Sequence, residues 1–371
     1  MLEELRIQGV RNLAPARLRL GSGFNIFLGP NGAGKTSILE ACHLLAMGRS
    51  FRTPQLRRVV REGEHYLGVG GDVSDPVTGG RHRLGVEWQG TRRSRLDGQW
   101  LKGHAAVAEW LPARVLHAGS FDLVGGGPEE RRRLLDWGCF HGVSGYREAW
   151  QRWRRAHEQR NAALRQGQTR AAREFEGPLV EAGERITRAR EEYVQRWRAC
   201  TVDAAARLGF SADLDGLDLR LRPGWEQRRS LAEAVERSRA GDEERGFAQV
   251  GPQRADLILR LAGRDATEGS RGEQKRLITG LVVGQGLMLM ERSGRSPLLL
   301  LDDVLSELDR GVASGLIAGL RDLGWQVLMT AVGAGFPGQE GQEPQWFHVE
   351  HGRVYEGSDP HVSRPHVPRE T

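Results

Sequence analysis

Residues 29–36 read Gly29-Pro30-Asn31-Gly32-Ala33-Gly34-Lys35-Thr36, and this stretch decides the fold of the 371-residue chain. It matches the pattern G-x-x-x-x-G-K-[ST], in which glycines let backbone N–H groups surround a phosphate. An apolar, β-rich stretch precedes it, and residues 36–47 carry apolar side chains at helical spacing. A glycine-rich turn that binds nothing is the alternative, but the strand–turn–helix setting favours a P-loop. The stretch therefore predicts an α/β fold that binds ATP.

Two residues of this loop have specific chemistry, and a later strand supplies their acidic partners. The Lys35 ammonium is a compact charge that fits between β- and γ-phosphates, and the Thr36 hydroxyl can bind Mg²⁺. Residues 298–303 read Leu-Leu-Leu-Leu-Asp-Asp, which is typical of a buried strand that ends in two carboxylates. We expect Asp302 to hold Mg²⁺ together with Thr36, and Asp303 to polarise the attacking water. An ordinary strand with an acidic turn is the alternative, which the P-loop makes less favourable.

A third motif opens a long apolar helix over residues 274–290. Gly269-Ser270-Arg271-Gly272-Glu273 combines a serine, two glycines and a helix N-terminus, which can form either a second anion site or an ordinary helix cap. Its position between the P-loop and Asp302 favours the anion site. Ser270, Arg271 and Gly272 are therefore candidates for nucleotide binding.

The composition changes twice along the chain, which indicates an insertion. Residues 1–108 read as short strands, the P-loop helix and a β-meander over 67–101. Residues 109–247 are rich in Arg, Glu, Ala and Leu at helical spacing, and strand–helix alternation returns over 248–357. We expect an α/β ATPase head, with a mixed sheet and flanking helices, interrupted by a mostly helical arm. Residues 358–371 are predicted to form a flexible tail.

The order of these motifs resembles that of the ATP-binding-cassette (ABC) ATPases. In that family the signature serine and glycine contact the γ-phosphate held by the other subunit, so the resemblance implies a homodimer that forms around ATP. Ser306-Glu307-Leu308-Asp309 is similar to the family's D-loop, which adds Asp309 to the nucleotide-binding candidates. Thr330 occupies the switch position and joins Asp302 and Asp303 as a catalytic candidate. The arm is too long for a compact transporter ATPase and too short for SMC coiled coils.

Further motifs narrow the resemblance to the RecF family of bacterial recombination mediators. They are Arg11-Asn12, Gly23-Phe24-Asn25, Gly48-Arg49-Ser50-Phe51-Arg52-Thr53, Leu135-Asp136-Trp137-Gly138-Cys139-Phe140-His141, Pro223-Gly224-Trp225 and Gly251-Pro252-Gln253-Arg254-Ala255-Asp256. The resemblance implies a switch that needs ATP and Mg²⁺, and that dimerises without sequence specificity on double-stranded DNA near gaps. Asn12 and Ser37 join its expected nucleotide contacts.

The same resemblance implies a place in DNA repair. A member of this family is expected to be a weak, DNA-stimulated ATPase in the cytoplasm, associated with the nucleoid. It is expected to act with RecR and RecO to load RecA during gap repair, replication restart and the SOS response.

Several positions depart from the family pattern. Val10 replaces the aromatic residue usual before Arg-Asn, and Gln253 stands where histidine is common. Glu273 replaces the signature glutamine, and its carboxylate near the expected phosphate predicts weakened or retuned closure of the dimer. His117-Ala118-Gly119 lacks the Pro-Glu pair expected before Ser120-Phe121, the presumed Q-loop.

Local charge favours DNA as the partner. The 54 basic residues exceed the 48 acidic ones, and the excess is concentrated in two runs. Residues 48–61 contain five arginines and no acid, and residues 150–173 contain seven arginines with Glu158 as the single acid. The planar guanidinium suits phosphate contact without base reading, although a solvated helix face is the alternative for the second run. The predicted DNA contacts are Arg49, Arg52, Arg57, Arg58, Arg152, Arg154 and Arg155.

Composition argues against other classes of protein. No apolar run approaches the ~20 residues of a membrane span, and the N-terminus lacks a signal-peptide pattern. Three scattered cysteines fit a reduced protein without a disulfide framework. Two other functions stay open: an SMC-like ATPase that organises DNA, and an ABC-type coupling ATPase of a membrane complex. The chain shows neither the long arm of the first nor a docking segment for the second.

Overall fold

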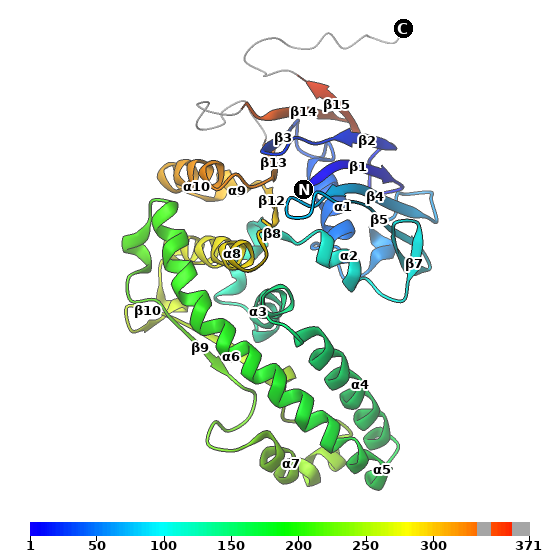
Figure 1. The fold of residues 1–371 in the computed structure, drawn as a ribbon, viewed down its shortest axis with the longest axis vertical. Helices are drawn as coiled ribbons and strands as arrows, with labels where there is room; N and C mark the ends of the chain where they lie inside the picture. The colour runs from blue at the N-terminus through cyan, green and yellow to red at the C-terminus, as the bar shows by residue number, and fades with distance from the viewer. Residues whose placement is uncertain (332–342, 358–371) are drawn as a thin grey trace. The chain divides into compact units, whose positions relative to one another are not determined.

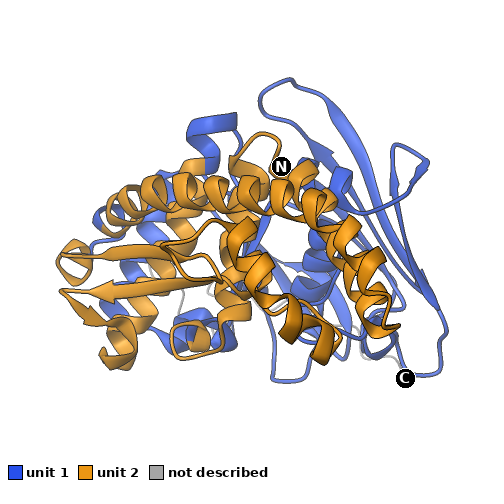
Figure 2. Ribbon diagram, turned by 90° about the horizontal axis from the view of Figure 1, so that it is seen from below, with its two compact units in different colours: residues 1–121, 206–210, 289–371 blue, residues 122–205, 211–288 orange. Residues whose placement is uncertain are grey.

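The computed structural model describes residues 1–331 and 343–357, which form two compact units (Figures 1 and 2). Unit 1 contains residues 1–121 and 206–210 and the described residues from 289 onward. Unit 2 contains residues 122–205 and 211–288. The predicted tail, 358–371, lies outside the described residues. No helix in the described ranges combines the length and apolarity needed to cross a membrane.

The units divide the chain at other points than the motif-based domains. By compactness, residues 248–288, which include the signature motif, belong to the helical unit. The order of motifs instead assigns these residues to the ATPase head. Residues 109–121 likewise belong to unit 1, because they include a strand of its sheet.

Unit 1 contains a mixed sheet, as the sequence predicts, and its six strands have the order β15-β14-β3-β13-β12-β8. All neighbouring strands are parallel except the β14–β15 pair. The strands span β3 (Phe24–Leu28), β8 (Ala113–His117), β12 (Leu298–Asp302), β13 (Val327–Ala331), β14 (Gln345–Glu350) and β15 (Arg353–Gly357). Residues 298–301 are all buried, which explains their continuous apolar run.

A second sheet of unit 1 is antiparallel, with the order β2-β1-β4-β5-β6-β7. Its strands span β1 (Leu2–Gln8), β2 (Ala16–Arg19), β4 (Leu67–Ser74), β5 (Arg81–Gln89), β6 (Thr91–Leu96) and β7 (Gln99–Leu101). Burial alternates along β4, so one face is apolar. That face packs with helix α1 (Lys35–Met47), and residues of α1, both sheets and the loop after β1 form one core.

Four other helical segments of unit 1 are short or peripheral. They are η1 (Leu56–Arg58), α2 (Ala105–Trp110), α9 (Val304–Glu307) and α10 (Arg310–Asp322). The sequence predicted α1 and α10 but neither β8 nor α2, because a strand or helix of five or six residues shows too little periodicity to be recognised.

Unit 2 is mostly helical, as predicted for the arm. Its helices are α3 (Pro128–Gly142), α4 (Tyr146–Arg165), α5 (Thr169–Glu174), α6 (Glu176–Arg207) and α7 (Leu231–Arg245), together with most of α8 (Arg271–Ser293). A three-stranded antiparallel sheet joins β9 (Asp218–Arg222), β10 (Asp256–Leu261) and β11 (Arg264–Asp265). The 3₁₀ segments are η2 (Ala118–Leu123), η3 (Ser211–Leu214), η4 (Pro252–Arg254) and η5 (Ala266–Glu268), of which η2 spans the boundary at residue 121.

Candidate nucleotide-binding site

The P-loop connects β3 to α1, as the sequence predicts (Figure 1). Gly34 precedes the first residue of α1 and has a φ of 117°, a conformation that L side chains rarely adopt. A Cβ at Gly34 would also lie 2.8 Å from Leu13 Cδ2 and 3.3 Å from Asn12 Oδ1. Glycine is therefore required here both for its backbone and for space. The first N–H groups of α1 face the loop, where they can bind an anion.

The Lys35 ammonium lies over this loop. Its Nζ donates to the carbonyl oxygens of Gly29 at 2.8 Å and Pro30 at 3.0 Å. Lys35 is only 5% exposed, so the packing around its stem fixes the position of the charge. The ammonium is therefore placed where a phosphate bound in the loop would meet it.

Two predicted nucleotide contacts, Asn12 and Ser37, hold the loop in place. Asn12 Nδ2 donates to the Gly32 carbonyl at 3.0 Å, and the Ser37 hydroxyl donates to Asn12 Oδ1 at 3.2 Å. The Asn12 side chain thus connects the loop to the first turn of α1. Direct contact of either side chain with the nucleotide stays a prediction.

The acidic residues meet the P-loop at the carboxyl edge of the parallel strands. The Thr36 hydroxyl donates to Asp302 Oδ1 at 2.8 Å, which joins the two predicted Mg²⁺ ligands. Thr330 Oγ1 lies 3.1 Å from Asp302 Oδ1 and 3.2 Å from Asp303 Oδ1, and it accepts the Asp303 backbone N–H at 2.8 Å. The structure therefore brings the three catalytic candidates together next to Thr36.

Burial raises the pKa of Asp302 above its ordinary value, and the charge of Asp303 adds to this effect. Hydrogen bonds from Thr36 and Thr330 and the nearby His117 act in the opposite direction. A divalent cation would stabilise the ionised form of Asp302. One carboxylate and one hydroxyl suit Mg²⁺, which keeps several waters and phosphate oxygens in its shell. No group of three or more His, Cys, Asp or Glu side chains suited to a metal ion occurs in residues 1–331 and 343–357, so the cation must rely on such additional ligands.

His117 is a neighbour of this site. From the sequence, His117 was assigned only to a divergent Q-loop. It ends β8, and its Cα is paired in register with that of Asp302 on β12. Its backbone N–H donates to the Ser120 hydroxyl at 3.1 Å, and its ring lies 5.2 Å from the Phe51 ring. The strand pairing, which sequence patterns did not reveal, brings this imidazole to the catalytic edge.

A cavity of about 690 Å³ opens beside the P-loop. The loop residues and Asp303 line one part of it. The remaining lining includes residues that sequence reasoning did not place near the nucleotide, namely Arg11, Arg52, Val60, Arg61 and Glu62. The basic run of residues 48–61 therefore contributes to the wall of the predicted ATP site as well as to the surface.

A buried carboxylate attaches this basic run to the P-loop helix. Glu40 of α1 is 0% exposed, and Arg11 Nε and NH2 bind its two oxygens at 2.8 Å each. The Ser50 hydroxyl also donates to Glu40, and Arg52 NH1 lies 3.5 Å from it. Arg11 NH1 also reaches the Arg58 carbonyl at 2.6 Å. In the sequence, the sign of this contact was a glutamate within an otherwise apolar helix. The partners of Glu40 became visible only in the fold.

Comparison with known proteins finds relatives over nearly the whole chain. Residues 1–343 match the family described as RecF/RecN/SMC N terminal domain. The chain is 38% identical to the DNA replication and repair protein RecF of Chromohalobacter salexigens, over 95% of this chain and 99% of that protein. It is 39% identical to RecF of Thioalkalivibrio sulfidiphilus, over 96% and 99% of the two chains.

The chain belongs to the RecF family. Its fold is also similar to a solved structure of the recombination mediator protein RecF with ATP, with a TM-score of 0.84, 23% identity and coverage of 96% and 97% of the two chains. An SMC head domain from Pyrococcus furiosus gives a TM-score of 0.55 at 14% identity, over 96% of each chain. Family membership and the assembled site identify the protein as an ABC-type ATPase, as the motif order predicts.

The signature motif of this RecF-family chain forms a complete helix cap. Ser270 N donates to Glu273 Oε2 at 2.7 Å, and Glu273 N donates to the Ser270 hydroxyl at 3.2 Å. Hydrogen bonds from the side chain and the backbone N–H of Ser270 lower the pKa of Glu273, so the carboxylate is ionised at neutral pH. Arg271 lies 3.4 Å from Asp122, and both side chains are largely exposed. The glutamate thus has a structural reason for its place in the motif, and nucleotide contact by Ser270, Arg271 and Gly272 stays a prediction.

Asp309, the D-loop candidate, is the N-cap of α10. Its Oδ1 accepts the Val312 N–H at 2.9 Å. This bond fixes the start of the helix, and the RecF-type contact of Asp309 with nucleotide stays a prediction.

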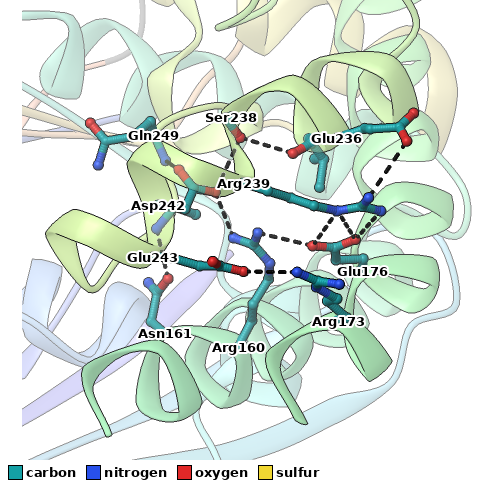
Figure 3. Close-up of polar contacts among 12 residues, drawn as sticks. Arg160, Asn161, Arg173, Glu176, Glu236, Ser238, Arg239, Asp242, Glu243 and Gln249 are labelled. Atoms are coloured by element: carbon teal, nitrogen blue, oxygen red, sulfur yellow. Dashed lines mark hydrogen bonds and ion pairs between the residues drawn. The ribbon is translucent and has the colours of Figure 1, made fainter. Parts of the chain in front are cut away.

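The second basic run is less cationic at the surface than its sequence suggests (Figure 3). Arg160 is 2% exposed and binds Asp242 at 2.8 Å and Glu176 at 3.1 Å. Arg173 pairs with Glu243 at 3.3 Å. Asp242 and Glu243 come from α7, and Glu176 begins α6 just beyond the run, so a count over residues 150–173 omits these acids.

The three arginines predicted to contact DNA in this run are exposed on α4. Arg154 pairs with Glu158 at 3.4 Å and lies 5.2 Å from the Trp150 ring. Arg152 and Arg155 border a cavity of about 460 Å³ that Phe175 and other residues of α5 and α6 complete. Among the residues of the first run, Arg57 and Arg58 are exposed in η1, whereas Arg52 is held towards Glu40. DNA contact by these arginines, and by Arg49, stays a prediction.

Proposed function

We propose that this RecF-family chain is an ATP-dependent switch that binds double-stranded DNA near gaps, without sequence specificity. ATP and Mg²⁺ drive formation of a homodimer on DNA, and slow, DNA-stimulated hydrolysis reverses it. The switch acts in the cytoplasm at the nucleoid with RecR and RecO, so that RecA is loaded during recombinational repair. The observation that carries this proposal is the cluster of Thr36, Asp302, Thr330 and Asp303 beside the P-loop cavity.

The residues of the cluster would divide the work in hydrolysis. The P-loop amides and Lys35 bind the β- and γ-phosphates, and Thr36 and Asp302 hold Mg²⁺, which offsets phosphate charge. Asp303, oriented through Thr330, accepts a hydrogen bond from the attacking water and positions it.

Dimer formation would complete the site. A P-loop binds the γ-phosphate from one side and leaves its other oxygens to solvent or to a second group. The N-terminus of α8, with Ser270 at its cap, is positively polarised and suits that role when a second copy supplies it. The ionised Glu273 opposes the same phosphate electrostatically.

Sedimentation velocity and gapped-DNA binding, each with ATP, ADP or no nucleotide, test the proposal. We expect dimers with ATP only, and tighter DNA binding by Asp303→Asn, in which closure outlasts hydrolysis. A protein that stays monomeric with ATP, or whose DNA affinity is the same with ATP and ADP, would contradict the switch.

Glu273→Gln provides a matched variant for the dimer itself. Glutamine can keep the contact of its side-chain oxygen with Ser270 N but removes the charge. We expect the ATP-dependent dimer to form at a lower protein concentration, while the thermal unfolding of the monomer changes little. Unchanged or weaker dimerisation would show that the carboxylate does not face the phosphate.

A further inference from the structure

A row of residues crosses the outer face of the antiparallel sheet, away from α1. The strand registers place each member opposite the next on the neighbouring strand, so that all share one face. In strand order the row reads Arg17, Arg6, Gly70, Gly85, Arg95 and Trp100. Strands lie about 4.8 Å apart, so the row extends for roughly 24 Å. Gly71, the neighbour of Gly70, faces Leu45 of α1, which confirms that the row points outward.

Two glycines hollow out the middle of this row. Gly70 and Gly85 pair directly, and neither has a positive φ, so their backbones do not require glycine. What they provide is space, since a Cβ would meet Arg6 Nε at 3.3 Å or Arg95 Nε at 3.5 Å. The result is a cavity of about 460 Å³ on this face, with arginines on both sides. Glycine within a strand often marks a place where a ligand approaches the backbone closely.

An exposed aromatic ring stands at one end of the row. Trp100 lies on the edge strand β7 and is 45% exposed. The Arg93 guanidinium is 3.8 Å from the ring centroid, and that of Arg95 is 5.4 Å away. An indole on an open face with cationic neighbours is a surface on which a base can stack.

The cations on this face outnumber the acids that could neutralise them. Arg6 and Arg17 share Glu4, at 2.5 and 2.8 Å. Arg6 and Arg83 also share Asp72, at 2.7 and 3.3 Å, and Arg95 is 3.6 Å from Glu87. Three further cations are exposed and form no ion pair with any acid in the described part of the chain. They are Arg19, Arg93 and Lys102, the last of which follows Trp100 by two residues.

We propose that this outer face binds an unpaired DNA strand, with phosphates along the arginines and a base stacked near Trp100. A ring can stack on a base face only where that base has left the duplex. A short, twisted edge such as β7 suits the addition of a protein strand poorly. The proposal rests on the proposed function only in taking DNA as the substrate, and it would give the chain a physical means of recognising a gap.

Single-strand binding by the full chain, without nucleotide, tests this proposal. The probe is a 20-mer of deoxythymidine with one 2-aminopurine, whose fluorescence changes when its base stacks. We expect saturable binding that weakens as salt increases, because phosphate contacts release counterions. A probe that is not bound in about 50 mM salt would overturn the proposal.

Three variants separate stacking, charge and space. Trp100→Ala should weaken binding by roughly tenfold and remove the stacking signal, whereas Trp100→Phe should keep most of both. Arg93→Glu should weaken binding more than Arg353→Glu, a charge-matched change at an exposed residue of the other sheet. Gly85→Val should fill the hollow and weaken binding while the fold is retained, since valine suits a strand. Affinities equal to the parent protein in Trp100→Ala and Gly85→Val would overturn the proposal.

Duplex binding in the same variants distinguishes this proposal from the proposed function. If ATP-dependent duplex binding persists while single-strand binding is lost, the two surfaces are separate, as we infer. Duplex binding that does not depend on ATP, together with loss of single-strand binding in the variants, would contradict the proposed ATP switch. The same result would support the strand-binding face.

Discussion

Thr330 has one hydroxyl proton and two carboxylates within reach of it. Because Thr330 Oγ1 also accepts the Asp303 backbone N–H, the hydroxyl is fixed in position and can donate to only one of Asp302 and Asp303 at a time. Asp302 has a second donor in Thr36, whereas Thr330 is the donor that the structure records for the Asp303 side chain. The threonine therefore orients the carboxylate that we expect to activate water.

Replacing Thr330 by valine keeps the shape and removes this hydroxyl. We expect ATP hydrolysis to fall about tenfold, since one hydrogen bond of roughly 1–2 kcal/mol is lost, while ATP affinity stays within a factor of about three. Single-turnover hydrolysis and binding of a fluorescent ATP analogue measure the two effects. Thr330→Ser should retain most of the activity, and an equally inactive serine variant would point to packing instead.

The raised pKa of Asp302 makes stability depend on pH. Because the folded-state pKa exceeds the unfolded one, the folded state binds the proton more tightly, and stability falls as pH rises through the raised pKa. Asp302→Asn removes this cost. Without Mg²⁺ and nucleotide we expect Asp302→Asn to raise the Tm at pH 8, and the gain to shrink towards pH 4. Thermal unfolding across that range checks the sign, and a gain that increases on acidification would contradict it.

At the scale of elements, the segment from Ser50 to Arg61 behaves as an attachment to α1. Arg11 N donates to the Val59 carbonyl at 2.8 Å, and Arg61 N donates to that of Gly9 at 2.9 Å. With the Glu40 contacts, these bonds connect the basic run to the loop after β1 and to the helix after the P-loop. A shift of this segment would therefore move the wall of the ATP cavity.

Breaking this attachment should cost stability and alter nucleotide binding. Glu40→Ala leaves the partly buried Arg11 without its carboxylate, and we expect a loss of about 2–4 kcal/mol. Urea denaturation measures the loss, with Glu129→Ala, which breaks an exposed pair with Arg133, as a control expected to cost under about 0.5 kcal/mol. We also expect weaker ATP binding in Glu40→Ala under conditions where it remains folded, and unchanged affinity would separate the two roles of the segment.

Elements differ in how well the sequence predicts them. The P-loop helix, the strand ending in Asp302 and the long helices of the arm were predicted, because each shows strong periodicity or a motif with fixed geometry. Strand β8 was not, since five mixed residues carry no distinct pattern. Without β8, the sequence could not place His117 beside Asp302.

At the scale of the whole molecule, each unit has its own means of stabilisation. Unit 1 has a continuous apolar core between two sheets. Unit 2 also contains a buried polar cluster, in which Arg160 links α4 to Glu176 at the start of α6 and to Asp242 of α7 (Figure 3). Arg239 binds the second oxygen of Glu176 at 2.9 Å. Arg160 thus joins three separate helices, of which α7 is distant from α4 in the sequence.

Arg160→Met should destabilise unit 2 selectively. Removing the guanidinium leaves two buried carboxylates short of a cation, and we expect a cost of about 3–5 kcal/mol. Hydrogen exchange should show faster opening of α4 and α7, while ATP binding at the P-loop is retained. Arg185→Met, which breaks an exposed pair with Glu181 at 3.6 Å, is the matched control and should change little. Equal exchange in both variants would show that the cluster is not what holds these helices.

The sequence by itself predicted which residues form the nucleotide site, because the P-loop and the two aspartates lie at the ends of strands, where local geometry places them. It also predicted that a mostly helical arm is inserted into the ATPase head. Tertiary structure decided which charges are available: Arg160 is buried, Arg52 turns towards Glu40, and Arg93 lies exposed beside Trp100. The physical reason is that tertiary packing sets the surroundings of each arginine: Asp242, for example, reaches Arg160 from 82 residues away in the chain. A local count of charge contains no information about such packing.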